Sequence, residues 1–187
     1  ISRKYPGGRF LWNSSIFGMS GPSTWDGSSP GIGNADTVTV RTAHNQRYTA
    51  RSALWSIPFT PLRNIDLRPA LDGAQAKAVK TLPYQPIHQV ALEVAQPFWE
   101  ADGLEASMWT DSPIGRVSAI YHGSKDDEVS SLVVSAFGPG ARHLDQLGPD
   151  GAAAFVVSEI ERMRPAAKGL LRVTARQSWE QDPLAGG

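Results

Sequence analysis

IHQVALEVAQPFWEADG, residues 87–103, contains the clearest strand pattern in the chain. Apolar and other residues alternate after Gln89, and side chains that alternate in this way point to opposite faces of a strand. One face then carries only apolar residues, namely Val90, Leu92 and Val94. The Pro-Phe-Trp run that begins at Pro97 ends the pattern, because proline cannot donate a ladder hydrogen bond. The stretch therefore predicts an amphipathic strand whose second face starts with a lone amide.

The segments around this strand predict an α+β fold. Apolar residues recur at helical spacing in 71–82, 140–147 and 151–164, and Asp72 is the predicted N-cap of the first of these helices. Short alternating runs predict strands at 37–40, 47–57, 105–109, 116–122, 130–137 and 169–179, the first two forming a hairpin or lying as two adjacent strands. This order, strands and then helices and then a strand, differs from the regular alternation that builds a parallel sheet.

The composition excludes several classes of function. The chain has 187 residues, of which 41% are hydrophobic and 19% charged, as in a globular protein. With 18 basic and 18 acidic residues it offers no overall field that would attract nucleic acid or a membrane surface. The absence of cysteine excludes thiol catalysis and thiolate-bound metals. The four histidines also lack the spacing of metal ligands, so no metal, nucleic acid or membrane partner is predicted.

The two ends of the chain differ from its middle. Residues 1–36 are rich in Gly, Ser and Pro and are predicted to form a loop-rich segment of unknown role. Within it, GIGNAD (31–36) has the glycines of a dinucleotide-binding loop but no strand before it and no helix after it, which favours a turn. The chain begins at Ile1 without a signal-peptide pattern and stops at DPLAGG. We expect both ends to be cuts in a longer product, made either by processing or by trimming.

From about residue 37 to 187 the chain resembles the flavin-containing amine oxidase family, which includes monoamine, polyamine and L-amino-acid oxidases. The resemblance rests on a series of motifs in the family's order. These are YTARSALWSIPFTPLRNIDLRPAL (48–71), AVKTLPY (78–84), QVALEVAQPFWEADG (89–103), TDSP (110–113), GARHLDQL (140–147) and the turn WEQDPLAGG (179–187).

The resemblance implies a fold with two interleaved domains. It implies an FAD-binding domain and a substrate domain built on a mixed β-sheet flanked by helices. Carried over, residues 37–60 belong to the FAD-binding domain, 61–176 form the substrate-binding domain, and 177–187 return to the FAD-binding domain.

The resemblance also implies a reaction. It implies an FAD-dependent oxidase that deaminates an L-amino acid, with L-glutamate as one candidate, and uses O2 to give an oxo acid, ammonia and H2O2. The alternatives within the family are an oxidase of a primary amine or polyamine, or a non-catalytic subunit. The family's glycine motif and its C-terminal FAD segment have no match here, so companion chains are expected to carry them. Some secreted relatives are cut into subunits, and the location of this protein stays open, with secretion as one option.

The candidate site residues come from the same resemblance. Gln89 stands where the family usually has a lysine that holds a water near the flavin, and an amide can still bind a water without supplying charge. Phe137 falls where L-amino-acid oxidases often have a tyrosine that contacts the substrate carboxylate. The predicted roles are catalytic for Gln89, substrate-binding for Trp109, Phe137 and Arg116, and cofactor-binding for Trp179 and Pro58. Arg116 is a candidate partner for a carboxylate, with an ordinary surface arginine as the alternative.

One hypothesis lies outside this family. The six tryptophans also suit a β-domain that stacks aromatic rings on a carbohydrate or a peptide. Such a domain would be a colourless monomer, whereas an oxidase would be yellow once its flavin is bound.

Overall fold

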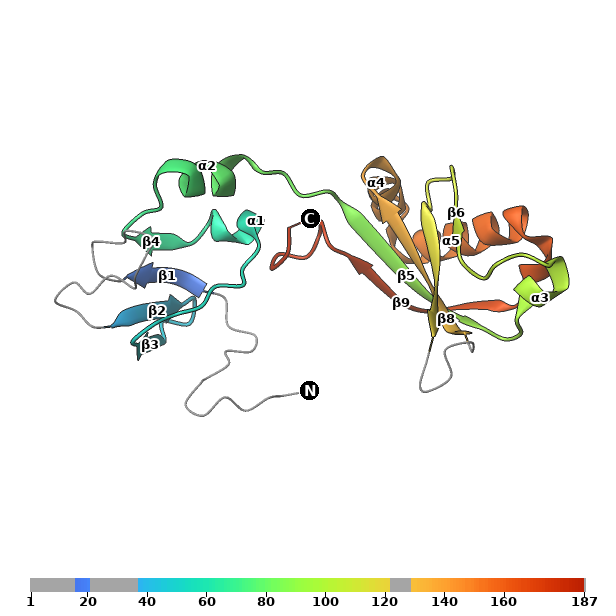
Figure 1. Ribbon diagram of the computed structural model, residues 1–187, viewed down its shortest axis with the longest axis horizontal. Helices are drawn as coiled ribbons and strands as arrows, with labels where there is room; N and C mark the ends of the chain where they lie inside the picture. The colour runs from blue at the N-terminus through green and yellow to red at the C-terminus, as the bar shows by residue number, and fades with distance from the viewer. Residues whose placement is uncertain (1–15, 21–36, 122–128, 187) are drawn as a thin grey trace. The chain divides into compact units, whose positions relative to one another are not determined.

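The computed structural model describes residues 16–20, 37–121 and 129–186, and divides the chain into two compact units (Figure 1). The first unit covers residues 1–82 and the second covers 83–187. Each unit combines a β-sheet with helices, which confirms the predicted α+β class.

The first unit has a four-stranded mixed sheet. Its strands are β1 (Ile16–Ser20), β2 (Val38–Thr42), β3 (Arg47–Ala50) and β4 (Asp66–Arg68), in the order β3-β2-β1-β4. β2 and β3 form the predicted antiparallel hairpin, and β1 pairs parallel with β4. The prediction of a loop throughout 1–36 was wrong at β1, because IFGMS has no alternation and is held as a strand by two neighbours distant in sequence. The GIGNAD segment lies outside the described residues.

Residues 61–82 pack with the first unit, although the domain boundary was expected between 60 and 61. Helix α1 (Phe59–Leu62) packs on helix α2 (Gly73–Thr81). Arg63 then donates to the carbonyl oxygens of Val79 and Leu82, both at 2.6 Å, and so satisfies acceptors at the end of α2. These contacts, together with the pairing of β4, place the border between the two compact units at 82/83, while the assignment of 37–60 and 61–176 to FAD-binding and substrate-binding domains stays a prediction. The predicted helix over 71–82 is confirmed, while Asp72 occupies its N-cap position without a side-chain capping bond.

The second unit is built on a five-stranded sheet in the order β6-β7-β8-β5-β9. Its strands are β5 (Ile87–Val94), β6 (Met108–Trp109), β7 (Arg116–Tyr121), β8 (Val129–Phe137) and β9 (Leu171–Ser178). All of its pairs are antiparallel. The opening strand behaves as predicted, since Val90 and Leu92 are fully buried. The strand expected at 105–109 is reduced to the two residues of β6.

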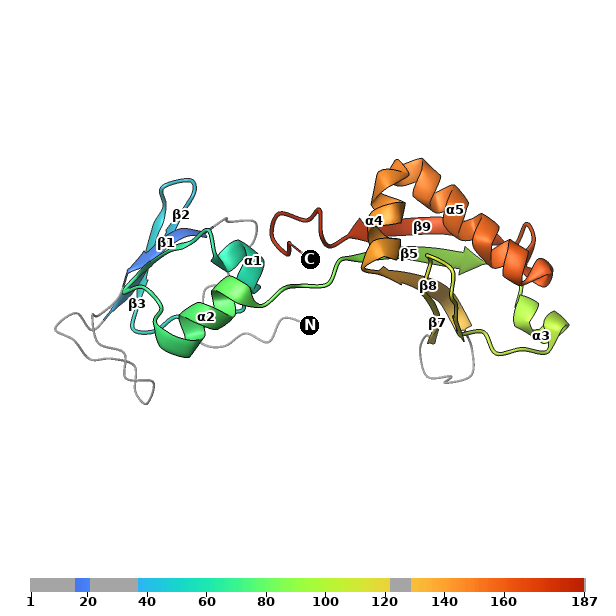
Figure 2. The same cartoon turned by 90° about the horizontal axis from the view of Figure 1, so that it is seen from above.

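Helices cover one face of this sheet (Figure 2). They are α4 (Pro139–Gln146), which packs on β5 and β8, and α5 (Gly148–Met163), which packs on β9. The core lies between the helices and the sheet and is formed by Val90, Leu92, Val117, Leu132, Val134, Ala136, Ala141, Leu144, Ala152, Val156 and Ile160. None of the described helices is long and apolar enough to span a membrane.

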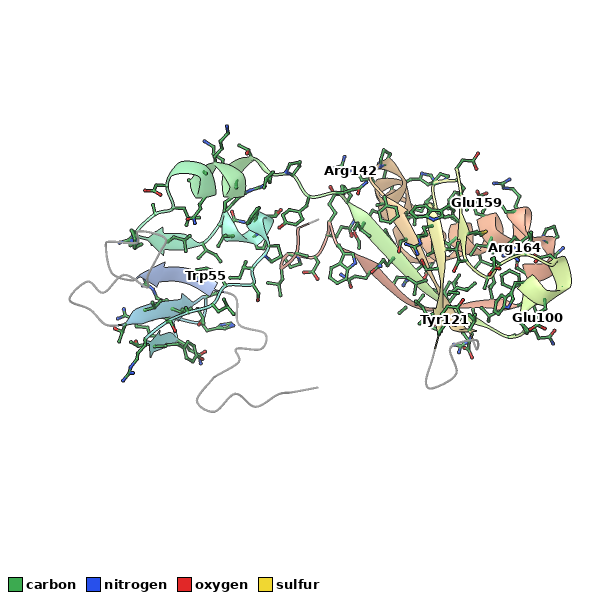
Figure 3. The ribbon with its side chains drawn as sticks, in the orientation of Figure 1. Trp55, Glu100, Tyr121, Arg142, Glu159 and Arg164 are labelled. Atoms are coloured by element: carbon green, nitrogen blue, oxygen red, sulfur yellow. The ribbon has the colours of Figure 1, made fainter. Side chains whose placement is uncertain are left out.

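A buried arginine links the C-terminal end of α5 to the segment after β5. Arg164, labelled in Figure 3, lies between α5 and the short helix η1 (Pro165–Ala167), and its side chain is only 4% exposed. It donates to both carboxylate oxygens of Asp102, at 2.8 and 2.5 Å, and to the carbonyl oxygen of Glu105 at 2.6 Å. These hydrogen bonds lower the pKa of Asp102. Arg164 thereby fastens the end of α5 to helix α3 (Phe98–Asp102).

The TDSP turn is attached to α5 by Glu159. Ser112 donates to Glu159 Oε2 at 2.5 Å, and Arg162 donates to both oxygens of the same carboxylate, at 2.9 and 3.0 Å. Hydrogen bonds from Arg162 and, next, from Ser112 lower the pKa of Glu159 to about 2. The turn before β7 is therefore held by an ionised side chain.

Glu159 should make the free energy of unfolding fall as the pH is lowered. Its pKa is lower in the folded state than in the unfolded chain, so its contribution is complete above about pH 4.5 and is lost as the pH falls toward 2. We expect Glu159→Gln to cost about 1 to 2 kcal/mol at pH 7, because Arg162 is largely exposed and solvent screens the pair. The stability difference from the wild type should shrink toward pH 2. Urea unfolding across pH 2 to 7 measures this, with the exposed Glu100→Gln as control, and a difference that stays constant would contradict it.

Candidate active site on the uncovered face of the sheet

Strand register places three predicted site residues, Trp109, Arg116 and Gln89, in one row that crosses all five strands of this sheet. Trp109 on β6 lies opposite Arg116 on β7, which lies opposite Ser135 on β8. Ser135 lies opposite Gln89 on β5, and Gln89 opposite Gln177 on β9. Residues directly opposite each other in antiparallel strands share a face. The buried residues next to them in the strands point toward the helices, so this row lies on the face that α4 and α5 leave uncovered.

Gln89 and Trp179 are joined directly. The indole Nε1–H of Trp179 donates to Gln89 Oε1 at 2.9 Å, and Gln89 Nε2 donates to Ser135 Oγ at 3.3 Å. Because an indole only donates, this contact fixes which end of the amide faces Trp179. The backbone N–H of Trp179 also donates to the carbonyl oxygen of Ile87 at 2.9 Å. The predicted catalytic residue and a predicted cofactor-binding residue thus form one unit.

Arg116 and Trp109 form a second pair at the other end of the row. The guanidinium carbon of Arg116 lies 5.1 Å from the centre of the Trp109 ring, within the range of a cation–π contact. Trp109 is 73% exposed, so this pair presents a positive charge and an aromatic surface that the rest of the unit does not cover.

The remaining candidates divide between the units. Phe137 is half-buried on β8, two residues beyond Ser135 and on the same face, and its register partner is Ile87. Pro58 belongs to the first unit, where it precedes α1. Sequence reasoning missed Ser135 and Gln177, because only the pairing of distant strands shows that they flank Gln89.

The glycine before Arg116 allows the backbone of β7 to lie close to that of β8. Gly115 has φ +70°, and a Cβ at this position would lie 2.7 Å from the carbonyl oxygen of Ser135. Gly103 is a matched control, because it has φ +68° with nothing within 4 Å of its Cβ position. Alanine at Gly103 therefore meets only backbone strain, whereas alanine at Gly115 meets strain and a collision with the backbone.

We expect Gly103→Ala to lower the free energy of unfolding by about 1 kcal/mol and Gly115→Ala by about 2 to 4 kcal/mol. Urea unfolding of both variants measures the difference, which isolates the close contact between the two strands. Equal losses at the two positions would contradict that explanation.

Three polar side chains lie beneath the Gln89–Trp179 pair, on the helix-covered face. Asp145 on α4 contacts His88 Nδ1 at 2.6 Å and accepts from Ser178 Oγ at 3.0 Å. His88 is 7% exposed, and its Nε2 is buried without a partner among the described residues. The sequence does not predict this cluster, because its three residues lie far apart in the chain, on two strands and a helix.

The α+β fold agrees with the class of protein that the motifs suggested. The chain matches the model of the flavin containing amine oxidoreductases over residues 30–187, and it belongs to this family. The family confirms FAD as the implied cofactor.

Individual relatives extend this finding. Over 158 residues the chain is 28% identical to the flavin-dependent L-tryptophan oxidase RebO of Lentzea aerocolonigenes, a match that covers 80% of this chain and 33% of that protein. In fold it is similar to putrescine oxidase bound to putrescine, with a TM-score of 0.66, 16% identity and coverage of 94% of this chain and 36% of the other. The corresponding values for cyclohexylamine oxidase from Brevibacterium oxydans are 0.69, 15%, 92% and 35%. The chain thus spans about one third of the length of these relatives.

The described residues fit part of FAD. Trp179 is 38% exposed and, with the amide of Gln89, offers a flat apolar surface beside hydrogen-bonding groups, which suits one edge of a planar ring system. A dinucleotide phosphate needs a strand, a glycine-rich loop and a helix in succession within a βαβ unit. Residues 16–20, 37–121 and 129–186 contain no such unit.

Proposed function

We propose that this chain supplies the substrate-facing sheet of an FAD-dependent oxidase that deaminates an L-amino acid. The observation that carries the proposal is the row on the uncovered face, in which Gln89, bonded to Trp179, shares one line of the sheet with Arg116. Such a row suits a flavin-containing enzyme, because the flavin carries out the reaction and the aromatic and amide side chains need only orient the amine.

FAD held beside Trp179 and Gln89 would supply the two-electron oxidation of the amine to an imine, with O2 as the final electron acceptor, reduced to H2O2. Water then hydrolyses the imine to the oxo acid and ammonia. The residues of this chain hold the substrate in place. Trp179 and Trp109 give aromatic surfaces against which the apolar part of a substrate can pack. Gln89 can hydrogen-bond a water or the amine but adds no positive charge.

Arg116 favours an amino acid over a simple amine. Its guanidinium carries a permanent charge, lies in the row of Gln89 and stacks on Trp109. A carboxylate is attracted to such a group and binds it with two parallel hydrogen bonds, whereas a diamine would be repelled. RebO is named as an L-tryptophan oxidase, which supports an amino acid as the substrate class, while the fold alone is shared with oxidases named for putrescine and cyclohexylamine.

A non-catalytic role is the second candidate, and one observation favours it. Both polar atoms of the Gln89 side chain are engaged, one by Trp179 and one by Ser135. An amide held in this way could serve as a structural link where relatives use a lysine.

We further propose that companion chains, or further residues of the same polypeptide, complete the FAD site. The coverage of about one third of each relative supports this, as does the missing phosphate-binding unit in the described residues. Native mass spectrometry of the assembly purified through this chain would report its other chains and any FAD.

The same assembly tests the reaction. Peroxide release should be measured with a panel of L-amino acids, primary amines and diamines. We expect amino acids to be preferred, and Arg116→Ala to raise their KM by about 10-fold or more, because it removes a charge-assisted contact. Arg172→Ala is the control, since Arg172 is an exposed arginine of the same sheet that pairs with Glu93. An assembly without flavin, or equal rates for amines and amino acids in wild type and Arg116→Ala, would contradict the proposal.

A further inference from the structure

The carboxylate of Asp145 ties two strands to one helix directly beneath the site. It contacts His88 on β5 and Ser178 on β9, and these two residues are register partners. An ionised carboxylate only accepts hydrogen bonds, so His88 donates through Nδ1 and Ser178 donates through Oγ. One side chain of α4 therefore holds both strands at the same level of the sheet.

Each of the two tied residues directly precedes a residue of the site. Gln89 follows His88, and Trp179 follows Ser178. Successive side chains point to opposite faces of a strand, so the contact of Asp145 with His88 on one face fixes the backbone from which Gln89 projects on the other. Trp179 is the first residue after β9, and its hydrogen bond to Gln89 places the indole on the same side. Ser178 Oγ also accepts the backbone N–H of Gln181 at 3.3 Å, which extends the restraint into the turn that carries Trp179.

The polar cluster of His88, Asp145 and Ser178 is more deeply buried than an ordinary surface contact. The side chains of His88 and Asp145 are 8% and 10% exposed. Polar groups removed from water cost free energy unless they are well paired, and an apolar pair would fill the same space without that cost. Only Nδ1 of His88 is used, since Nε2 has no partner among the described residues. The cluster therefore holds the strands through one nitrogen of the imidazole.

We propose that His88, Asp145 and Ser178 form a positioning cluster that sets the orientation of Gln89 and Trp179 for the reaction, an inference that rests on the proposed oxidase function. Asp145 is its central positioning residue, because its carboxylate bonds both His88 on β5 and Ser178 on β9. Loss of either contact frees one member of the indole–amide pair to rotate or shift. Small displacements of this kind in an active site cost about 10- to 100-fold in rate.

Four variants of the intact assembly test the proposal. Asp145→Leu and His88→Leu remove the acceptor and the donor, and we expect each to lower kcat about 10-fold or more with a smaller change in KM. His88→Asn should restore wild-type kcat, because the asparagine Nδ2 replaces the Nδ1 donor and the unused Nε2 is not needed. Asp102→Leu is the control for stability, since it breaks the buried pair with Arg164 beyond the opposite end of β5 and should lower Tm without lowering kcat.

Hydrogen–deuterium exchange gives a readout that needs no turnover. The backbone amides of Trp179 and Gln181 are bonded to Ile87 and to Ser178, and their protection should fall in Asp145→Leu and His88→Leu but persist in His88→Asn and Asp102→Leu. This pattern in an assembly that oxidises no substrate would refute the oxidase function and leave the positioning cluster supported. Unchanged protection in Asp145→Leu, or an equal fall of kcat in Asp102→Leu, would overturn the inference.

Discussion

Replacing Arg164 with methionine is expected to lower the free energy of unfolding by about 3 to 5 kcal/mol, the typical loss when one partner of a buried ion pair is removed. The Arg164 side chain is almost closed to water, and it donates three hydrogen bonds, two of them to an Asp102 side chain that is 21% exposed. Its guanidinium carbon lies 4.8 Å from the centre of the Phe98 ring. Methionine fills part of this volume but removes the donor to the Glu105 carbonyl oxygen, and it leaves the Asp102 carboxylate with the backbone N–H of Leu104 at 3.2 Å in place of the guanidinium. Urea unfolding of the intact protein measures the loss.

Arg172→Met is the matched control for this experiment. Arg172 also pairs with a carboxylate, that of Glu93, but the two side chains are 72% and 51% exposed. Exposed pairs contribute about 0 to 1 kcal/mol, so Arg172→Met should be close to neutral. If the two variants lost the same stability, burial would not be the reason that the Arg164 contacts matter. Arg164→Lys should recover only part of the loss, since an ammonium cannot reproduce the flat donor arrangement that holds both oxygens of Asp102.

If the proposed oxidase function holds, replacing Gln89 with leucine is expected to lower kcat/KM of the assembly by about 10- to 100-fold. Leucine has a similar size but can neither accept from the Trp179 indole nor donate to Ser135, so both contacts that orient the site are lost together. Steady-state peroxide formation measures the effect. A leucine variant as active as the wild type would place Gln89 outside the reacting site.

Two further variants, Gln89→Glu and Gln89→Lys, test separately the contact with Trp179 and the contact with Ser135. Gln89→Glu retains an acceptor for Trp179, whereas Gln89→Lys retains only a donor toward Ser135. If the orientation of Trp179 governs turnover, the glutamate variant keeps more activity than the lysine variant. If the missing charge governs it, lysine raises turnover instead, and a wild type that is inactive until Gln89→Lys is introduced would identify a non-catalytic subunit.

The strand 87–94 was predictable because its signal is local. Val90 and Leu92 alternate with less apolar residues, and alternation decides which side of a strand faces the core whatever its partners are. Helices α2, α4 and α5 were predictable for the same reason, since helical spacing needs no distant contact. The motifs around these elements were also sufficient for the family, which the match over residues 30–187 confirms.

The site residues were only partly predictable. Gln89, Trp109, Arg116 and Trp179 were identified as candidates from the order of the motifs, but nothing local shows that they share one face or that Gln89 and Trp179 touch. Ser135 and the Asp145 cluster were missed, because their meaning arises only when β5, β8, β9 and α4 come together.

The sequence by itself determined the α+β class, the amphipathic strand and the family. The tertiary structure alone decided that β1 joins the first sheet, that residues 61–82 pack with it, and that Gln89 bonds an indole 90 residues away. The physical reason is the range of the forces involved. Periodicity expresses the preference of each segment for one buried face, whereas register depends on hydrogen bonds between segments that meet only in the folded chain.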